Sequence, residues 1–161
     1  MTTRIKILTF LNFLIVVFCN QTSAQNTLTK EILWSTDWSP NGKYIAIGGN
    51  VDSLKIYNGS DLKTHKSLPI KNTITRVKWH PVKNMIAVST QNSVDKTSII
   101  NLDNDDKIEL NGISPEGARG IDWNYTGEYL AVADNEGQIL IYNIKGELIR
   151  KFVNQSNSTK S

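Results

Sequence analysis

A chain of 161 residues, of which 39% are hydrophobic and 20% charged, has the composition of one ordinary globular domain. Its formal net charge of +3 is not gathered in a basic cluster, so we expect no nucleic-acid partner. With a single cysteine, Cys19, no disulfide can form within the chain. No set of ligands has the spacing of a metal site, so we expect neither a metal nor another cofactor.

The first 24 residues predict a cleavable secretion signal. Arg4 and Lys6 form a basic start, and a largely apolar segment follows at 7–19. Small residues then lead up to Ala24, after which we expect cleavage. The apolar segment is too short for a bilayer, which needs about 20 residues, so no stable membrane anchor is expected. The sequence therefore predicts a secreted or periplasmic protein.

Cleavage would change both the charge and the thiol chemistry of the chain. The number of basic residues would fall from 18 to 16 against 15 acidic residues, which leaves a formal charge of +1. Cys19 would leave with the signal, so cysteine-based catalysis is excluded for the mature chain. Stability must then come from packing.

Three similar segments follow, and they align on a tryptophan that each of them contains. The tryptophans are 41 and 44 residues apart, and a turn rich in Pro, Gly and Asn comes after each. An alanine between two large apolar residues stands eight positions further on. The repeated pairs are Trp38 with Ala46, Trp79 with Ala87, and Trp123 with Ala131. The pattern predicts a β-hairpin at each copy.

Two further strands are predicted in every copy. The third strands are expected at 53–58, 96–103 and 138–144, and the fourth near 63–70, 107–113 and 148–154. Four short strands in each 40–45 residues are typical of a propeller blade. We therefore predict an all-β, propeller-like arc of three four-stranded antiparallel blades in an incomplete ring. The blades are placed at about 32–70, 71–113 and 114–154, within a mature chain that starts at 25, and the polar segment 155–161 is expected to be disordered.

The repeats resemble those of the WD-repeat family over about 32–154. The stretches WSPNGKYIAIGG and WNYTGEYLAVAD are similar to the first two strands of a WD repeat, and GQILIYN is similar to its third. Tyr57 and Tyr142, each followed by Asn, stand where the family usually has Trp-Asp. No copy has the Gly-His pair that precedes the first strand in the family. The resemblance implies a scaffold that binds proteins through loops on one rim.

The repeated tryptophans are interpreted as core residues. A blade is covered on both faces by its neighbours, and the alanine of each second strand leaves room for a large partner such as an indole. The alternative is an exposed aromatic platform for sugars or single-stranded nucleic acid. The fixed place of Trp38, Trp79 and Trp123 in the repeat favours burial.

Charged residues stand immediately before each tryptophan. They are Asp37, Lys78 and Asp122, and the resemblance implies that they line the central channel in neighbouring blades. This row, which alternates in sign, predicts ion pairs from blade to blade, with independent hydration of each side chain as the alternative.

The resemblance also implies which loops bind a partner. They lie at 50–52, 91–95 and 135–136 within blades, and at 71–73 and 114–119 between them. The candidate binding residues are Asn50, Asp52, Gln91, Asp95, Asn135, Glu136 and Arg119. Arg119 is the only one of a type that is enriched at binding hot spots.

Three blades are too few for a ring, because propellers close with four to eight. The chain is expected to be a truncated propeller, an arc that pairs its open faces with another copy, or one that closes on a partner protein, and we favour the first over a dedicated dimer. No catalytic set of residues is visible, so we predict a non-catalytic protein-interaction scaffold. The alternatives are an accessory piece of a secreted hydrolase, a sugar- or peptide-binding module, and a non-functional fragment.

Overall fold

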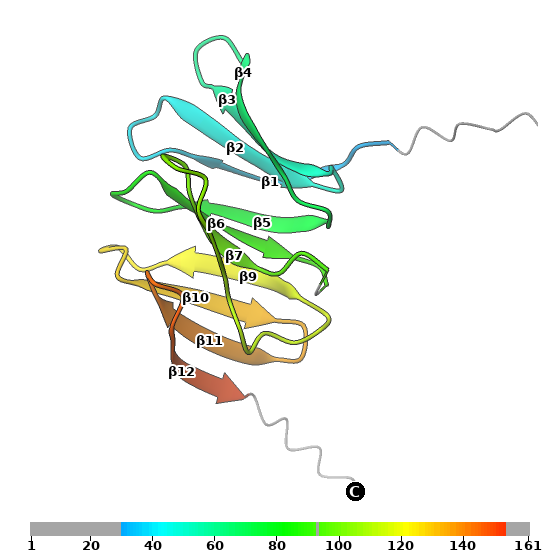
Figure 1. Ribbon diagram of the computed structural model, residues 1–161, viewed down its shortest axis with the longest axis vertical. Coiled ribbons are helices and arrows are strands. Elements are labelled where there is room, and N and C mark those ends of the chain that lie inside the picture. Colours follow the sequence, from blue (N-terminus) through cyan, green and yellow to red (C-terminus); the bar gives the residue numbers. More distant parts are fainter. Residues whose placement is uncertain (1–29, 93, 154–161) are drawn as a thin grey trace, which may run out of the picture. The chain divides into compact units, whose positions relative to one another are not determined.

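The computed structural model describes residues 30–92 and 94–153, with one compact unit beginning at Glu31. The predicted signal at 1–24 and the predicted disordered tail at 155–161 lie outside these residues. Within 31–153 the chain forms three sheets of four strands that follow one another in sequence order (Figure 1). We call them blade one, blade two and blade three.

Each blade is an antiparallel meander in which every strand pairs with the next one along the chain. Blade one consists of β1 (Leu33–Trp38), β2 (Tyr44–Gly49), β3 (Ser53–Asn58) and β4 (Thr64–Pro69). Blade two consists of β5 (Ile74–Trp79), β6 (Met85–Thr90), β7 (Ser98–Asn101) and β8 (Lys107–Glu109). Blade three consists of β9 (Ala118–Trp123), β10 (Tyr129–Asp134), β11 (Gln138–Asn143) and β12 (Leu148–Val153). This arrangement confirms the predicted all-β fold with three four-stranded antiparallel blades in an open arc.

The hairpin after each tryptophan forms because its turn residues satisfy the backbone locally. In blade one Gly42 has a φ of +67°, and its N–H donates to the Ser39 carbonyl at 2.8 Å. Blade three repeats the turn with Gly127 at +76° and a bond to the Asn124 carbonyl at 3.0 Å. A residue with a Cβ is strained at such angles, so glycine is the natural choice here.

The apolar core lies between the blades in two clusters. One joins blades one and two, and its buried members include Ala46, Leu54, Ile56, Ile74, Val77, Trp79, Ile86 and Val88. The other joins blades two and three, and includes Ala87, Ile99, Ile121, Trp123, Leu130, Val132, Leu140 and Tyr142. Blade two contributes to both clusters, so both of its faces are covered.

The difference between a covered and an open blade is visible in the second strands. In β6 of blade two, five consecutive residues, 86–90, are buried. In β10 of blade three, buried residues alternate with more exposed ones. Since side chains of a strand point to opposite faces in turn, alternation means that one face of blade three is open.

The expectation that all three tryptophans lie in the core was wrong for Trp38. Trp79 and Trp123 are 6% and 9% exposed, whereas Trp38 is 55% exposed. Trp79 packs toward blade one and Trp123 toward blade two, so each tryptophan faces the preceding blade. Among the described residues no blade precedes blade one, and Trp38 therefore faces solvent.

Candidate interaction surfaces

At the junction of blades one and two, Trp79 packs on the inner face of blade one. Its ring is nearly parallel to that of Tyr44, with ring centres 6.5 Å apart. Tyr44 stacks in turn on His65 at 4.3 Å. Ala46 and Ile56 belong to the same apolar cluster. Aromatic pairs of this kind add about 0.5–1.5 kcal/mol to the free energy of burial, so Trp79 is a principal contact of this junction.

Side-chain oxygens of β1 accept hydrogen bonds from backbone N–H groups of β5 at this junction. The Trp79 N–H donates to Asp37 Oδ2 at 2.7 Å, and the Val77 N–H donates to Ser35 Oγ at 3.0 Å. These N–H groups lie on β5, the edge strand of blade two, and point away from its own sheet. A buried donor must find an acceptor, and β1 of the preceding blade supplies it.

The junction of blades two and three uses a different set of polar groups. The ring of His80 lies 4.8 Å from that of Trp123, and His80 Nε2 is 3.1 Å from the Gly127 carbonyl oxygen. The indole Nε1–H of Trp123 donates to the Lys78 carbonyl at 3.2 Å. Two backbone N–H groups of its own turn, those of Val82 and Lys83, donate to His80 Nδ1 at 3.0 and 2.9 Å. His80 is therefore neutral, with its proton on Nε2, and burial lowers its pKa below the ordinary value of 6.5.

The charged row before the tryptophans is only partly joined by ion pairs. Lys78 Nζ lies 3.8 Å from Asp122 Oδ1, which also accepts the Trp123 N–H at 3.1 Å. Asp37 instead uses its carboxylate on the Trp79 N–H. The partner of the Asp37 carboxylate is therefore a backbone N–H and not the lysine that was predicted.

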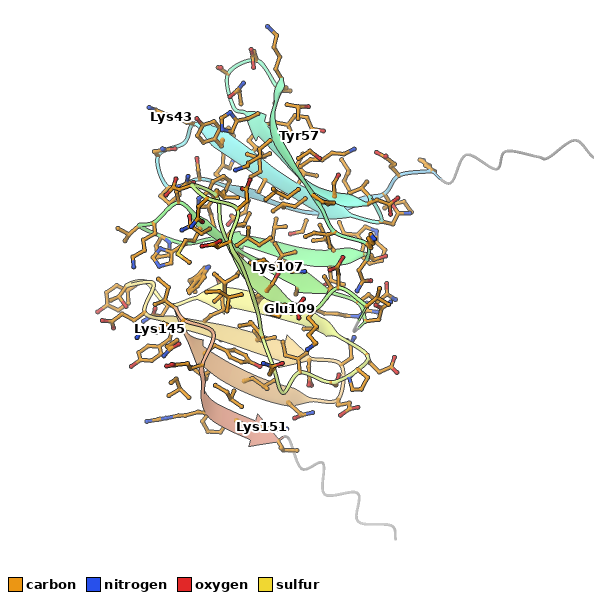
Figure 2. The ribbon with its side chains drawn as sticks, viewed as in Figure 1. Lys43, Tyr57, Lys107, Glu109, Lys145 and Lys151 are labelled. Atoms are coloured by element: carbon orange, nitrogen blue, oxygen red, sulfur yellow. The ribbon has the colours of Figure 1, made fainter. Side chains whose placement is uncertain are left out.

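Blade three leaves an apolar face uncovered. Tyr129, Ile139 and Phe152 are 44%, 48% and 53% exposed. A shallow hollow of about 350 Å³ lies on this face, lined by Tyr129, Ile141, Ile149, Arg150 and Phe152. Figure 2 marks the same end of the stack with Lys151 on β12.

Blade one leaves the opposite end of the stack open. Trp38 is 55% exposed there, and its ring lies over Gly59, where a Cβ would clash with it. Ile45, Ile47 and Tyr57 are half-buried on the same face, which the strand pairing of Trp38 with Ile45 and of Ile45 with Tyr57 defines. Figure 2 shows Tyr57 on this blade.

Two of the predicted rim residues fasten the loops to the body of the protein. Asp95 accepts hydrogen bonds from Lys107 Nζ at 2.9 Å and from the Lys71 N–H at 2.5 Å. The bond from Lys107 is the main reason why the pKa of Asp95 is lowered, although burial opposes it. Asn135 Nδ2 donates to the Glu116 carbonyl at 2.5 Å. These groups are used within the chain.

Most of the other predicted rim residues also make hydrogen bonds within the chain. The Asn50 side chain accepts the Ile32 N–H. Backbone groups of the next three are also bonded: the Ile70 N–H donates to the Asp52 carbonyl at 3.2 Å, the Gln91 N–H to the Thr73 carbonyl at 3.0 Å, and the Glu136 N–H to Asp134 Oδ1 at 3.1 Å. Arg119 is exposed on β9. The bonds of Asn50, Asp52, Gln91 and Glu136 tie the rim loops to neighbouring segments, and the role of these residues in binding stays a prediction.

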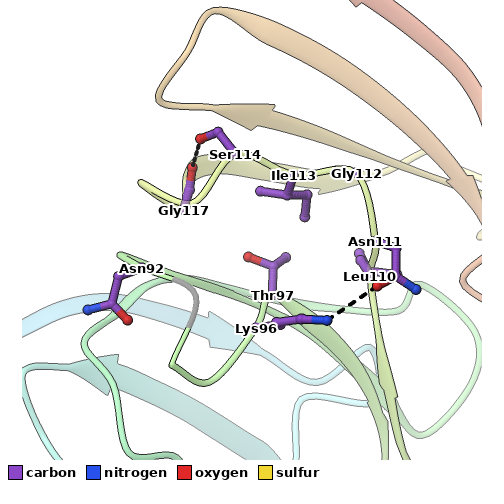
Figure 3. A pocket seen from close by; sticks show the side chains of 9 residues that line it. All are labelled: Asn92, Lys96, Thr97, Leu110, Asn111, Gly112, Ile113, Ser114 and Gly117. Atoms are coloured by element: carbon purple, nitrogen blue, oxygen red, sulfur yellow. Dashed lines mark hydrogen bonds between the residues drawn. The ribbon is translucent and has the colours of Figure 1, made fainter.

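One cavity lies at this rim, between blades two and three (Figure 3). Its volume is about 150 Å³, below the roughly 300–1,000 Å³ of typical small-molecule sites. Two of its polar side chains are bonded to their neighbours: Lys96 Nζ lies 3.3 Å from Asn111 Oδ1, and Ser114 Oγ donates to the Gly117 carbonyl at 3.4 Å. The open blade faces are therefore the larger candidate surfaces.

Residues 30–92 and 94–153 show neither a metal site nor a membrane-spanning helix. These residues contain no group of three or more His, Cys, Asp or Glu side chains that could hold a metal ion. They also contain no helix long and apolar enough to cross a membrane.

Comparison with protein families gives one match that spans nearly the whole chain. A sequence model of the family described as eukaryotic translation initiation factor eIF2A matches residues 11–156. The chain belongs to the eIF2A family. A search of curated proteins finds no match.

A solved structure agrees with the fold of this eIF2A-family chain. It is the β-propeller domain of Cps50 (Swd1) from Myceliophteria thermophila, with a TM-score of 0.67 and 15% sequence identity. The match covers 74% of this chain and 41% of that one, so the chain spans less than half the length of the solved propeller domain. At this identity the likeness shows the fold alone, which is that of a β-propeller.

Sequence reasoning missed the hollow on blade three. Tyr129, Ile141 and Phe152 belong to three different strands, and only the strand register brings them together. A signal was present, because Tyr129 stands at the same place in its repeat as Tyr44, six positions after the tryptophan. The direction in which each tryptophan points was the missing information.

Proposed function

We propose that this chain is a non-catalytic protein-interaction scaffold, secreted or periplasmic, that binds protein through the two open faces of its blade stack. The observation that carries the proposal is the apolar character of both faces, where Trp38 and Phe152 are more than half exposed. Contiguous apolar surface of this kind marks protein-binding sites on soluble proteins. The rim loops support binding less well, because several of their polar groups are bonded within the chain.

The energetic argument favours a partner on these faces. Fully burying one large apolar side chain contributes about 1.5–3 kcal/mol. The hollow on blade three is lined by four large apolar or aromatic side chains and Arg150. Three of them, Tyr129, Ile149 and Phe152, are about half exposed, and covering these would contribute roughly 2–5 kcal/mol, a large part of the stability of a typical domain.

The family name refers to translation initiation. We propose no such activity for this chain, because the signal predicted at 1–24 would direct it out of the cytoplasm, where translation takes place. Whether the mature chain is found inside or outside the cytoplasm decides between a role in translation and the proposed role as a scaffold.

Photo-crosslinking in the host cell tests the proposal. A photoreactive phenylalanine analogue is placed at Trp38 on blade one or at Ile139 on blade three, and covalent adducts are identified by mass spectrometry. The matched control is Tyr125, which is 90% exposed but lies in the turn between β9 and β10. We expect specific protein adducts at the two face positions, in the secreted or periplasmic fraction, and none at Tyr125.

Equal labelling at all three positions, or none at any, would contradict the proposal. A chain that stays in the cytoplasm with residues 1–24 attached would refute the secreted location.

A further inference from the structure

We propose that a second copy of this chain closes the arc, with Trp38 of each copy seated in the hollow on blade three of the other. The inference rests on the proposed function, since it names the occupant of the same two faces. The argument comes from the inner junctions of the chain, which show how one blade receives the next.

The open hollow on blade three repeats the surface on which Trp79 packs. Strand pairing aligns Tyr129 with Tyr44, and Ile141 with Ile56, since each pair stands at the same register in its blade. In β12 and β4 the extra residue at the irregularity is Ile149 in one blade and His65 in the other. The residues that line the hollow, Tyr129, Ile141, Ile149, Arg150 and Phe152, thus correspond to Tyr44, Ile56, His65, Lys66 and Leu68.

In blade one this surface is filled. Tyr44 stacks on Trp79, and Ile56 and Leu68 belong to the same apolar cluster. In blade three the corresponding surface is exposed, and Tyr129 is 44% exposed. The side chain that corresponds to Trp79 and lacks a receiving surface is Trp38, which is 55% exposed. The two unfilled halves of one repeated contact therefore lie at opposite ends of the same chain.

The backbone of β1 supplies a matching donor. The Ser39 N–H donates to the Tyr44 carbonyl in the sheet, so the N–H of the preceding residue, Trp38, points away from it. The corresponding N–H of Trp79 is accepted by Asp37. Asp122 stands at the place of Asp37 in blade three, and its contacts with Lys78 and with the Trp123 N–H both use Oδ1. Its Oδ2 would accept the Trp38 N–H of the second copy.

A second polar contact is repeated at the outer strands. Lys66 donates to the Leu102 carbonyl of blade two at 2.8 Å. Arg150 stands at the place of Lys66 on the open face. The residue that matches Leu102 in blade one is Gly59, since both follow the end of a third strand and both N–H groups donate across the second hairpin. Arg150 would therefore donate to the Gly59 carbonyl of the second copy.

The number of blades limits how many copies can form the ring. Known propellers typically close with four to eight blades. The described residues of one copy form three blades, and two such sets make six, a number within that range. Each contact joins unlike faces, and the two contacts are equivalent by a twofold axis.

Mixing two face variants tests the head-to-tail contact. Trp38→Arg damages the inserted side chain and Tyr129→Arg damages the receiving hollow. A dimer of either variant alone has one altered residue in each of its two contacts, so we expect its dissociation constant to rise by roughly 30-fold or more. In an equal mixture, Trp38 of the Tyr129→Arg copy meets the unchanged hollow of the Trp38→Arg copy. One contact is then intact, and a heterodimer should form. Light scattering coupled to size exclusion measures the mass, and the wild-type chain is expected at twice the mass of one copy.

The controls separate this contact from other arrangements. Tyr125→Arg, on an exposed turn, should leave the wild-type dimer intact, and circular dichroism reports whether each variant is folded. If Tyr129→Arg disturbs the fold, Phe152→Arg replaces it, because Phe152 lies on the edge strand and is 53% exposed. If Trp38→Arg disturbs it, Trp38→Ser replaces it.

Four results would overturn the second-copy contact. A wild-type chain that stays monomeric up to millimolar concentration would assign the faces to another protein or to further blades. A Tyr129→Arg variant that dimerises alone would indicate a face-to-face contact through blade one. A mixture of the two variants that stays monomeric would exclude the head-to-tail contact. Adducts to a different protein in the crosslinking experiment would leave the proposed function standing while refuting the second copy.

Discussion

The two inner junctions place a tryptophan in the same position but surround it with different polar groups. Between blades one and two, Trp79 lies on Tyr44 and its N–H reaches Asp37. Between blades two and three, the ring of Trp123 contacts that of His80 at an angle of 59°, and its indole N–H donates to the Lys78 carbonyl of blade two. The Asp37 carboxylate of the first junction is replaced at the second by Lys78, which points to Asp122 instead.

The comparison separates what the repeat must keep from what it can vary. A large side chain must fill the space beside a small one, because protein interiors are packed without sizeable voids. A buried N–H needs an acceptor, and either a carboxylate or a carbonyl can supply it. The apolar arrangement is therefore common to both junctions while the hydrogen bonds differ, and the open faces preserve the apolar arrangement without a partner.

The largest expected difference in stability is between two repeat tryptophans, one covered by the preceding blade and one exposed. Trp123→Ala removes an indole that is 9% exposed, and should lower the free energy of unfolding by about 3–5 kcal/mol. Trp38→Ala removes one that is 55% exposed and should cost about 1 kcal/mol or less in the single chain. Urea unfolding, followed by circular dichroism at a protein concentration where copies are separate, measures both values.

Equal losses for the two variants would contradict the assignment of Trp38 to an open face. Repeating the urea series at high protein concentration sharpens the comparison. If a second copy covers Trp38, the loss caused by Trp38→Ala should grow with concentration, because association stabilises the folded state by mass action. The loss caused by a tryptophan within one chain should not grow in this way.

A smaller difference is expected between two glycines at the same place in their turns. Gly42 and Gly127 both have positive φ angles, +67° and +76°, so alanine should cost about 1–2 kcal/mol at either position. At Gly127 a Cβ would also clash with the ring of His80, whereas at Gly42 it would meet nothing within 4 Å. Overpacking adds roughly 1–3 kcal/mol, so Gly127→Ala should be the more destabilising.

Thermal unfolding of the two alanine variants checks this expectation. A Gly42→Ala variant as unstable as Gly127→Ala would mean that backbone strain alone sets both values. His80→Ser, which removes the ring, should bring the cost of Gly127→Ala close to that of Gly42→Ala in the double variant.

The blades could be predicted from the sequence because their signal is local and repeated. A tryptophan, a turn and an alanine recur in phase three times, and each hairpin is formed within one short segment of the chain, 33–49, 74–90 or 118–134. The same pattern appears in the structure as β1 and β2, β5 and β6, and β9 and β10. Three matching copies outweigh the weak preference of any single one.

The placement of the surfaces could not be predicted, since it depends on direction. The repeat shows that Trp38 is equivalent to Trp79, but not that each tryptophan points toward the preceding blade, which leaves the first one uncovered. The rim residue Asp95 was expected to face a partner, yet a lysine from β8 lies 2.9 Å from its carboxylate. Such contacts join residues whose closeness follows only from the folded loops.

The smallest expected effect concerns pH and distinguishes the two junctions by their chemistry. Burial lowers the pKa of His80 below 6.5, the bond to the Gly127 carbonyl opposes this, and Lys83 lowers it further. The unfolded chain therefore binds this proton more readily than the folded chain does. The contribution of His80 to stability should be complete above pH 6.5 and should be lost as the pH falls from 6.5 toward the folded pKa.

Protonation would also place a hydrogen on Nδ1, where Val82 and Lys83 donate their N–H groups. In His80→Asn, which gives blade two the residue that Asn124 provides in blade three, this part of the pH dependence should disappear. Urea midpoints between pH 7.5 and pH 5 measure the difference, and equal slopes for both proteins would show that the second junction is not the pH-sensitive one.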